Sequence, residues 1–383
     1  MTTHRLLLIL MATLLIVACS KDEVDTNTSP SANSDITFNV DEDNALGATR
    51  ATTRANFDTK KQFRVYAWTN GSNIPVIYKL SDDINSNVVS YNTSTGVWNT
   101  QHTFYWPDDN TDIDFYAFHP VDVPFDADNR QIVYTMPIDG HTDPLYAKAV
   151  TNKRNSNYTG VSNTYSAQIN FRHALCRVVF LANVNSASTD LSVIIRSLQI
   201  CNVMSQGAFN YPTGSTTSTD ANSYGSWASL SAPTIYSLDM TAPMALTTTA
   251  VSLTEDSSAP LLIPQALTAW DPTTNTIAQN DALATPGSYL KIGCSILVNG
   301  GEYADDGYIY CPFTSIIPGA NPGDPDMTWT PANTYTYALT FANRQDGING
   351  SGYDSNGKPI VQSLVITAAI KPWNTTTSSG TIY

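Results

Sequence analysis

Residues 36–40 read Ile36-Thr37-Phe38-Asn39-Val40, and this stretch decides the fold class. Its apolar and polar side chains alternate, which is the pattern of a β-strand with one face toward a core and the other toward water. Similar short runs recur in the first half of the chain, at residues 63–68, 76–80, 103–106, 114–119 and 131–136. Turn-forming segments rich in Pro, Asn and Asp separate them. The pattern predicts an all-β protein.

The second half of the chain continues the pattern. Strands are predicted at residues 191–201, 259–263, 288–298, 308–312, 334–341 and 360–370. The run at residues 166–184 predicts strands with a bend near His173-Ala174. Short strands at a spacing of roughly 8–12 residues are typical of β-sandwiches.

The polar segment at residues 183–190 predicts a domain boundary, because its residues are small and carry few core side chains. A chain of 383 residues is long enough for about one to three domains. We therefore expect two β-sandwich domains in tandem, at residues 35–184 and 185–383.

The composition excludes some partners. The chain has 19 Lys+Arg against 33 Asp+Glu, for a formal net charge of −14. This excess of negative charge repels phosphate backbones and anionic lipid headgroups, so we expect no nucleic acid partner and no membrane binding through a basic patch. The apolar fraction of 42% is too high for a disordered chain.

The N-terminus predicts a lipoprotein. Residues 6–18 form an apolar run that follows Arg5 and is too short to span a bilayer, so residues 1–18 are expected to be a signal peptide. The run ends at Cys19, preceded by small residues, as in a bacterial lipobox. We expect a lipid on Cys19 and a polar tether at residues 19–34 that follows the anchor. The alternative is a soluble secreted protein with a coincidental cysteine there.

Four other cysteines are present: Cys176, Cys201, Cys294 and Cys311. Their spacing contains no C-x-x-C pair, so neither a zinc site nor a redox motif is indicated. Cys294 and Cys311 flank a predicted hairpin tip and can face each other across two strands. We expect buried thiols in strands and leave open a disulfide between these two.

Two stretches resemble ligand loops but lack essential residues. Residues 352–359 nearly match a phosphate-binding loop, but Pro359 replaces the required hydroxyl and Asp354 would repel phosphate. Residues 108–114 resemble the start of a calcium loop, without its later Gly and Glu. We expect both to be turns, and therefore no catalytic residue, metal site or cofactor.

Other residue types associated with chemistry are interpreted as structural. His173 lies in an apolar run, which predicts a hydrogen-bonded core histidine. The tryptophans at positions 68, 98, 227 and 270 can stack on sugars, but core packing is the expected role for most of them.

Several strings in order resemble the fimbrillin family, the type V pilins and their relatives in Bacteroides-type bacteria. They are Phe63-Arg64-Val65-Tyr66-Ala67-Trp68, Tyr105-Trp106-Pro107, Phe115-Tyr116-Ala117-Phe118-His119-Pro120, Pro144-Leu145-Tyr146-Ala147, Phe171-Arg172-His173-Ala174-Leu175, Leu262-Ile263-Pro264-Gln265, residues 329–337 (WTPANTYTY) and Ile370-Lys371-Pro372-Trp373. Residues 20–23 resemble the signal that sends such lipoproteins to the outer face of the outer membrane.

The resemblance implies transthyretin-like sandwiches and a surface pilus subunit that is not an enzyme. It also implies cleavage after an arginine, for which Arg50 and Arg54 lie in the expected place, followed by polymerisation through strand exchange. Ile36, Phe38 and Val40 have the alternation that a displaceable N-terminal strand requires. The implied partners are other pilus subunits, the outer membrane through Cys19, and a host or bacterial surface ligand.

Two questions stay open at this point. The first is position in the pilus: residues 374–383 are mostly Thr, Ser and Gly, which suits a tip or accessory subunit that donates no strand. The second is an alternative function, a surface glycan-binding lipoprotein of a nutrient-uptake system, which would share the lipobox and the export signal. Such a protein has no need for the arginine-containing loop after residue 40.

We predict that Cys19 carries the lipid anchor. A radiolabelled fatty acid should enter the wild-type chain and not Cys19→Ala, because the thiol is the acylation site. The measurement is label incorporation in the protein band from growing cells, with Cys176→Ala as the control. Equal labelling of wild type and Cys19→Ala would show that the anchor lies elsewhere or is absent.

Overall fold

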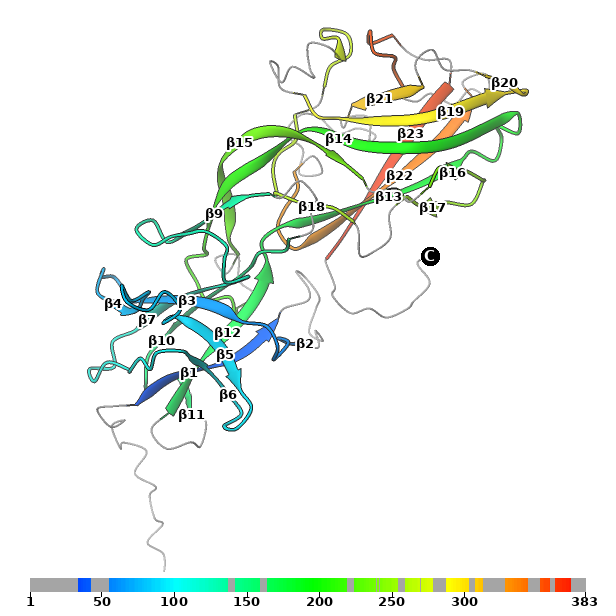
Figure 1. Ribbon diagram of the computed structural model, residues 1–383. Helices are drawn as coiled ribbons and strands as arrows, with labels where there is room; N and C mark the ends of the chain where they lie inside the picture. The colour runs from blue at the N-terminus through cyan, green and yellow to red at the C-terminus, as the bar shows by residue number, and fades with distance from the viewer. Residues whose placement is uncertain are drawn as a thin grey trace, which may run out of the picture.

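The protein is described by a computed structural model, shown in Figure 1. The structure describes residues 34–42, 55–136, 142–158, 164–218, 224–238, 240, 242–253, 259–268, 270–277, 287–302, 307–312, 328–343, 352–358 and 362–372. The elements with described bounds are 23 β-strands in three sheets, so the all-β prediction is confirmed. Among the described residues, no helix has the length and hydropathy needed to cross a bilayer.

The first sheet, here sheet A, has ten strands. They are β1 (Asp35–Glu42), β2 (Ala55–Asn56), β3 (Phe63–Thr69), β4 (Pro75–Ile77), β5 (Val88–Asn92), β6 (Val97–Thr100), β7 (Ile113–His119), β10 (Leu145–Thr151), β11 (Asn157–Tyr158) and β12 (Thr164–His173). β1 pairs with β6 on one side and with β12 on the other, so seven strands close into a ring in the order β12-β10-β7-β3-β5-β6-β1. The alternation pattern did not predict this closure.

Aromatic and aliphatic side chains fill the interior of the sheet A ring. Phe38, Phe63 and Phe115 are fully buried there, and the Phe38 ring meets the other two edge to face at centroid distances of 6.0 Å. Edge-to-face pairs place the positive ring edge on the negative ring face, which stabilises them beyond area burial. This packing explains why residues 36–40, with their alternating apolar and polar side chains, form a strand.

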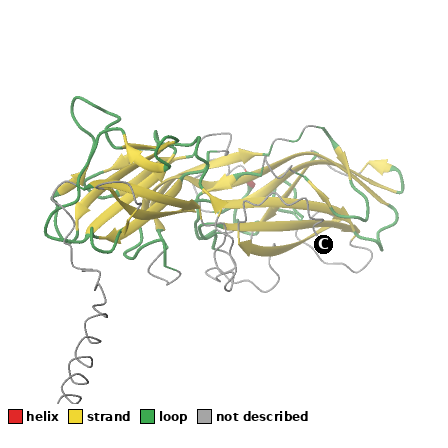
Figure 2. Cartoon of the chain, turned by 90° about the horizontal axis from the view of Figure 1, so that it is seen from below, coloured by secondary structure: helices red, strands yellow, loops and turns green. Residues whose placement is uncertain are grey.

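Sheets B and C face each other across the second core. Sheet B contains β8 (Phe125–Asp126), β9 (Gln131–Thr135), β14 (Leu191–Asn210), β15 (Ser226–Ser237), β16 (Met244–Ala245), β19 (Tyr289–Val298), β20 (Gly301–Glu302) and β21 (Tyr308–Pro312). Sheet C contains β13 (Cys176–Val184), β17 (Val251–Ser252), β18 (Leu261–Leu262), β22 (Asn333–Asn343) and β23 (Gln362–Pro372). Buried side chains of β14 and β19 meet those of β13 and β22 in one core. Figure 2 shows the whole chain, sheet A included, as an elongated body with most strands running along it.

Two strands cross between the halves of the chain. β9 comes from the first half but pairs with β14 over five residues. β13 lies N-terminal to residue 184 but pairs in parallel with β22 over eight residues. The division into domains at residues 184 and 185 stays a prediction. The pairing of β13 with β22 favours a boundary between β12 and β13, at Ala174-Leu175, although β9 lies before this point and still belongs to sheet B. The predicted bend near His173-Ala174 is confirmed at that point.

Some predicted strands are shorter or absent. Residues 103–106 do not form a strand, although Tyr105 makes an isolated bridge with Asp35. Phe104 O accepts from Ile36 N at 2.9 Å, and Trp106 N donates to Ser34 O at 3.0 Å. Pro107 follows directly and has no N–H to extend this pairing. The predicted strand at residues 259–263 is likewise reduced to β18.

Stability should fall as pH falls through about 6.5, partly because of His119. Burial lowers the pKa of His119 below its usual value, an effect that the hydrogen bond to Gln62 O partly offsets. Nearby Lys61 also lowers it, whereas Asp143 and Glu42 raise it. Below about pH 6.5 the unfolded chain therefore binds a proton that the native imidazole resists, so protonation favours unfolding.

His119→Gln should therefore flatten the loss of stability between about pH 7.5 and pH 5.5 relative to the wild type. The measurement is the urea midpoint across this range. The control is His102→Gln, a change at an exposed imidazole, which should behave as the wild type. An unchanged slope for His119→Gln would contradict the prediction.

Candidate functional site

β1, which is the predicted displaceable strand, is a full member of sheet A. It pairs in parallel with β12 over eight residues, from Asp35 opposite Thr164 to Glu42 opposite Phe171. On its other side it meets β6 at Thr37 and Phe38, and β2 at its last two residues. Removing β1 would therefore open the ring and expose the backbone edge of β12.

The two faces of β1 have different chemistry. Ile36, Phe38 and Val40 are buried, with exposed fractions of 2%, 0% and 8%. Together they cover the interior of the ring, and burying each such side chain contributes about 1.5–3 kcal/mol. The other face makes polar contacts: Thr37 Oγ1 lies 2.7 Å from Ser166 Oγ, and Gln168 Nε2 donates to Asp41 Oδ2 at 3.1 Å. β1 thus has the form of a plug with every second side chain in a groove.

Residues associated with processing fall outside the described part of the chain. Arg50 and Arg54 lie between β1 and β2, and Cys19 lies before β1, all outside the described residues. Only twelve positions, 43–54, separate the end of β1 from the start of β2.

A segment from the second half completes sheet A. β10 and β12 pair at only two positions, Leu145 with His173 and Tyr146 with Arg172. Beyond them, Thr216 lies between the two strands and is fully buried. Its N–H donates to Lys148 O at 2.8 Å, and its hydroxyl lies 2.7 Å from Asn170 O and accepts from Lys148 N at 3.2 Å. Thr216 therefore replaces strand pairing at this seam.

Further contacts fix the 211–218 segment, which carries Thr216, against sheet A. The Tyr211 hydroxyl donates to Ala117 O at 3.0 Å, and its ring packs edge to face on Tyr116. Lys148 Nζ donates to Thr213 O, and Arg172 donates to Ser218 O at 2.7 Å. The sequence analysis did not predict these contacts, because nothing local in Ser, Thr and Gly residues indicates a distant partner.

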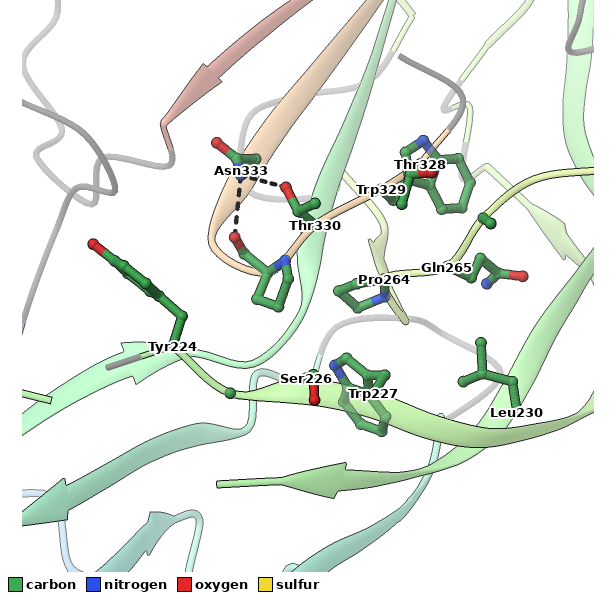
Figure 3. A pocket seen from close by; sticks show the side chains of 13 residues that line it. Tyr224, Ser226, Trp227, Leu230, Pro264, Gln265, Thr328, Trp329, Thr330 and Asn333 are labelled. Atoms are coloured by element: carbon green, nitrogen blue, oxygen red, sulfur yellow. Dashed lines mark hydrogen bonds between the residues drawn. The ribbon is translucent and has the colours of Figure 1, made fainter. Parts of the chain in front are cut away.

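A pocket of about 470 Å³ lies between the start of β15, residues 264–266 and residues 328–333. Figure 3 shows Pro264 between Trp227 on β15 and Thr330 on the segment that leads into β22. None of the described side chains that line it carries a charge. Trp68, Trp98 and Trp270 are buried, as expected for core residues, whereas Trp227 is half-buried and faces this pocket.

The residues that resembled ligand loops are used in turns. Asp109 caps Thr111 N, Asp112 accepts from Asn152 Nδ2, and Asp114 is buried 3.9 Å from Lys148 Nζ. At residues 352–358 the Asp354 side chain accepts from the backbone of Asn356 and Lys358. Across the part of the chain that the structure describes, no group of three or more His, Cys, Asp or Glu residues is placed to hold a metal ion.

The cysteines and His173 are part of the core. Cys176, Cys201, Cys294 and Cys311 are buried thiols on strands, as predicted. Cys311 lies opposite Leu290 rather than Cys294, so the ladder does not bring the possible disulfide partners together. Burial raises the pKa of the Cys176 and Cys311 thiols, which keeps them protonated. His173 Nδ1 lies 2.7 Å from Asp143 Oδ2, which confirms a hydrogen-bonded core histidine.

Comparison with known families assigns the chain. A family model described as fimbrillin-like matches residues 49–373. The chain belongs to the fimbrillin-like family. Membership of this family indicates a fimbrial protein that is located at the cell surface. The match begins after β1, so the family pattern covers the ring without its first strand.

Solved structures of fimbrial proteins are similar to this fimbrillin-like chain. A fimbrial protein from Bacteroides vulgatus ATCC 8482 has a TM-score of 0.50 at 14% identity, over 88% of this chain and 99% of that chain. The tip fimbrial protein Mfa3 from Porphyromonas gingivalis, with a C-terminal truncation, has a TM-score of 0.42 at 11% identity, over 89% of this chain and 100% of that chain. No curated protein matches the sequence.

Thr216→Val should destabilise the chain by about 1–3 kcal/mol, because it leaves buried backbone groups of Lys148 and Asn170 without the hydroxyl. The measurement is the free energy of unfolding in urea. Thr217→Val, at the adjacent and less buried position, should cost clearly less. Equal losses for the two variants would mean that Thr216 does not hold the seam.

Proposed function

We propose that this protein is a structural and adhesive subunit of a surface fimbria that assembles by strand exchange and has no catalytic activity. The observation that carries the proposal is β1, a complete eight-residue strand that closes the sheet A ring and is followed at once by the arginine-containing residues 43–54. In this proposal cleavage after Arg50 or Arg54 frees β1. A segment of another subunit then takes its place beside β12.

Physical chemistry supports such an exchange. An open ring exposes the unpaired backbone groups of β12 and the groove that Phe38 now fills, and both favour capture of another strand. An incoming strand with apolar residues at every second position regains the ladder and the interior contacts. The contacts by which β1 closes the ring are therefore strong, but a strand of another subunit can replace them.

We propose further that the chain is an outer membrane lipoprotein anchored through Cys19, with two transthyretin-like sandwich domains. Sheets B and C, which enclose one core, support the second sandwich. The expected partners are other pilus subunits and a ligand on a host or bacterial surface. Family membership supports the fimbrial part of this proposal over the nutrient-uptake alternative.

The position in the pilus is proposed from the C-terminal strand. β23 pairs with β22 over all eleven of its residues, from Gln362 opposite Asn343 to Pro372 opposite Asn333. A strand used so fully in its own sheet is costly to release for donation. We propose a tip or accessory subunit that accepts a strand and donates none.

The exchange is tested with a labelled peptide of residues 34–42 after limited trypsin digestion of the chain. The peptide should bind only the cleaved protein, because an intact ring has no vacant edge. A peptide with Phe38→Ala should bind at least about tenfold more weakly, because it loses the interior ring, while Asn39→Ala, at a half-buried position outside the core cluster, serves as the matched control. Equal binding to intact and cleaved protein, or none to either, would contradict strand exchange.

The proposed tip or accessory position in the pilus is tested with a form of the protein that begins at Ala55. It should stay monomeric on a gel run without boiling, because it has a groove but no donor. A ladder of detergent-resistant oligomers that disappears when residues after Gln362 are deleted would identify a shaft subunit instead.

A further inference from the structure

The pocket beside β15 has the features of a built binding site. Three segments far apart in sequence form its walls, and its volume of about 470 Å³ lies within the range of about 300–1,000 Å³ that is usual for small-molecule sites. Its described lining includes no residue of β1 or of the other ring strands, although Tyr224 and Gly225 contact β12 and β10 behind it.

The aromatic wall is held in place before any ligand arrives. Trp227 Nε1 donates to Ala174 O at 2.6 Å, and its ring packs edge to face on Phe209 at 5.4 Å. Gly207 on β14 makes room for it, since a Cβ there would lie 2.8 Å from Leu230 and 3.1 Å from the indole. A flat ring fixed at a half-exposed position in the lining offers apolar surface to a ligand at low entropic cost.

The polar groups at the pocket are neutral. Asn333 Nδ2 donates to Thr330 Oγ1 at 2.7 Å and to Pro331 O at 3.2 Å, which commits its N–H₂ group and leaves the carbonyl oxygen to accept. Ser226 carries an exposed hydroxyl, and Tyr224 carries a phenol whose ring lies over Arg172. None of the described lining side chains is charged, and Arg172, whose guanidinium packs on the Tyr224 ring, is buried and donates to Ser218 O. The described lining therefore has no exposed charge to select an anion or a cation.

Three backbone amides of the pocket walls are already paired. Trp329 N donates to Gln265 O, Gly225 N to the Tyr146 hydroxyl, and Thr330 N to the Tyr335 hydroxyl. An extended peptide gains its affinity from a row of vacant backbone groups, and these three positions offer none. The outer edge of β15 pairs with no described strand, so a peptide competitor belongs in the test. The side chains of the lining offer a ligand an apolar face and neutral hydroxyl or amide groups.

We propose that this pocket binds a neutral saccharide, with the C–H face of a sugar ring on Trp227 and its hydroxyls on Ser226 and Asn333. Pyranose rings have this combination of an apolar face and a polar edge, and they carry no charge unless modified. The inference does not depend on strand exchange, so each can fail without the other.

The test is an array that carries neutral hexose and N-acetylhexosamine oligosaccharides beside their sialylated and sulfated forms, probed with the purified full chain. Titration of the best oligosaccharide, followed by tryptophan fluorescence, then compares variants. Ser226→Ala and Asn333→Ala should each weaken binding about fivefold, the usual effect of losing one hydrogen bond. Ser231→Ala, an exposed position on the same strand outside the pocket, should leave affinity unchanged. Thermal melts of each variant separate loss of binding from loss of folding.

Three results would overturn the proposal. The first is no saturable binding to any neutral oligosaccharide. The second is a preference for the sialylated or sulfated forms, and the third is binding that Ser226→Ala and Asn333→Ala leave unchanged in folded protein. Displacement of the sugar by a proline-rich peptide, with the peptide binding more tightly, would assign the pocket to a protein partner instead.

Discussion

The parallel pairing of β1 with β12 is the constraint on which sheet A depends. It closes seven strands into a ring and places Phe38 against Phe63 and Phe115. Without it, the β12 edge and the aromatic interior would face water, which costs both hydrogen bonds and apolar burial. The closing strand, β1, is also the first strand of the chain. One cleavage of the backbone after β1 is therefore enough to free β1 from the rest of the chain. Stability and the proposed assembly therefore rest on the same contact.

The opposite seam of the ring depends on the second half of the chain. β10 and β12 separate after two pairs, and the 211–218 segment fills the gap through Thr216. This segment directly follows β14, the longest strand of sheet B. Sheet A is thus completed by a part of the chain that sheet B positions. The two halves are coupled on one side of β12, while the other side of β12 holds the strand proposed to exchange.

Much of the fold was predictable because local patterns carry it. Alternation at Ile36, Phe38 and Val40 predicted which side chains are buried, and the apolar run around His173 predicted a core histidine. Residues 103–106 show the limit of prediction from local patterns. Their composition is typical of a strand, but they form only a single bridge to β1. Thr216 could not have been assigned, because its partners lie 46 and 68 residues away and a small polar residue gives no local sign of such contacts. Trp227 stood out only as one of four tryptophans, because its place at a pocket depends on three segments that are distant in sequence.

The length of β14 has a mechanical consequence. Its 20 residues span about 65 Å, with β9 and β15 bonded near one end and β19 along the other. At Tyr211 the chain passes straight into contact with β7. A tensile load along β14 thus passes directly into the 211–218 segment, which is held against sheet A. It strains the flanking ladders in shear, where many hydrogen bonds resist together, rather than peeling them apart one at a time.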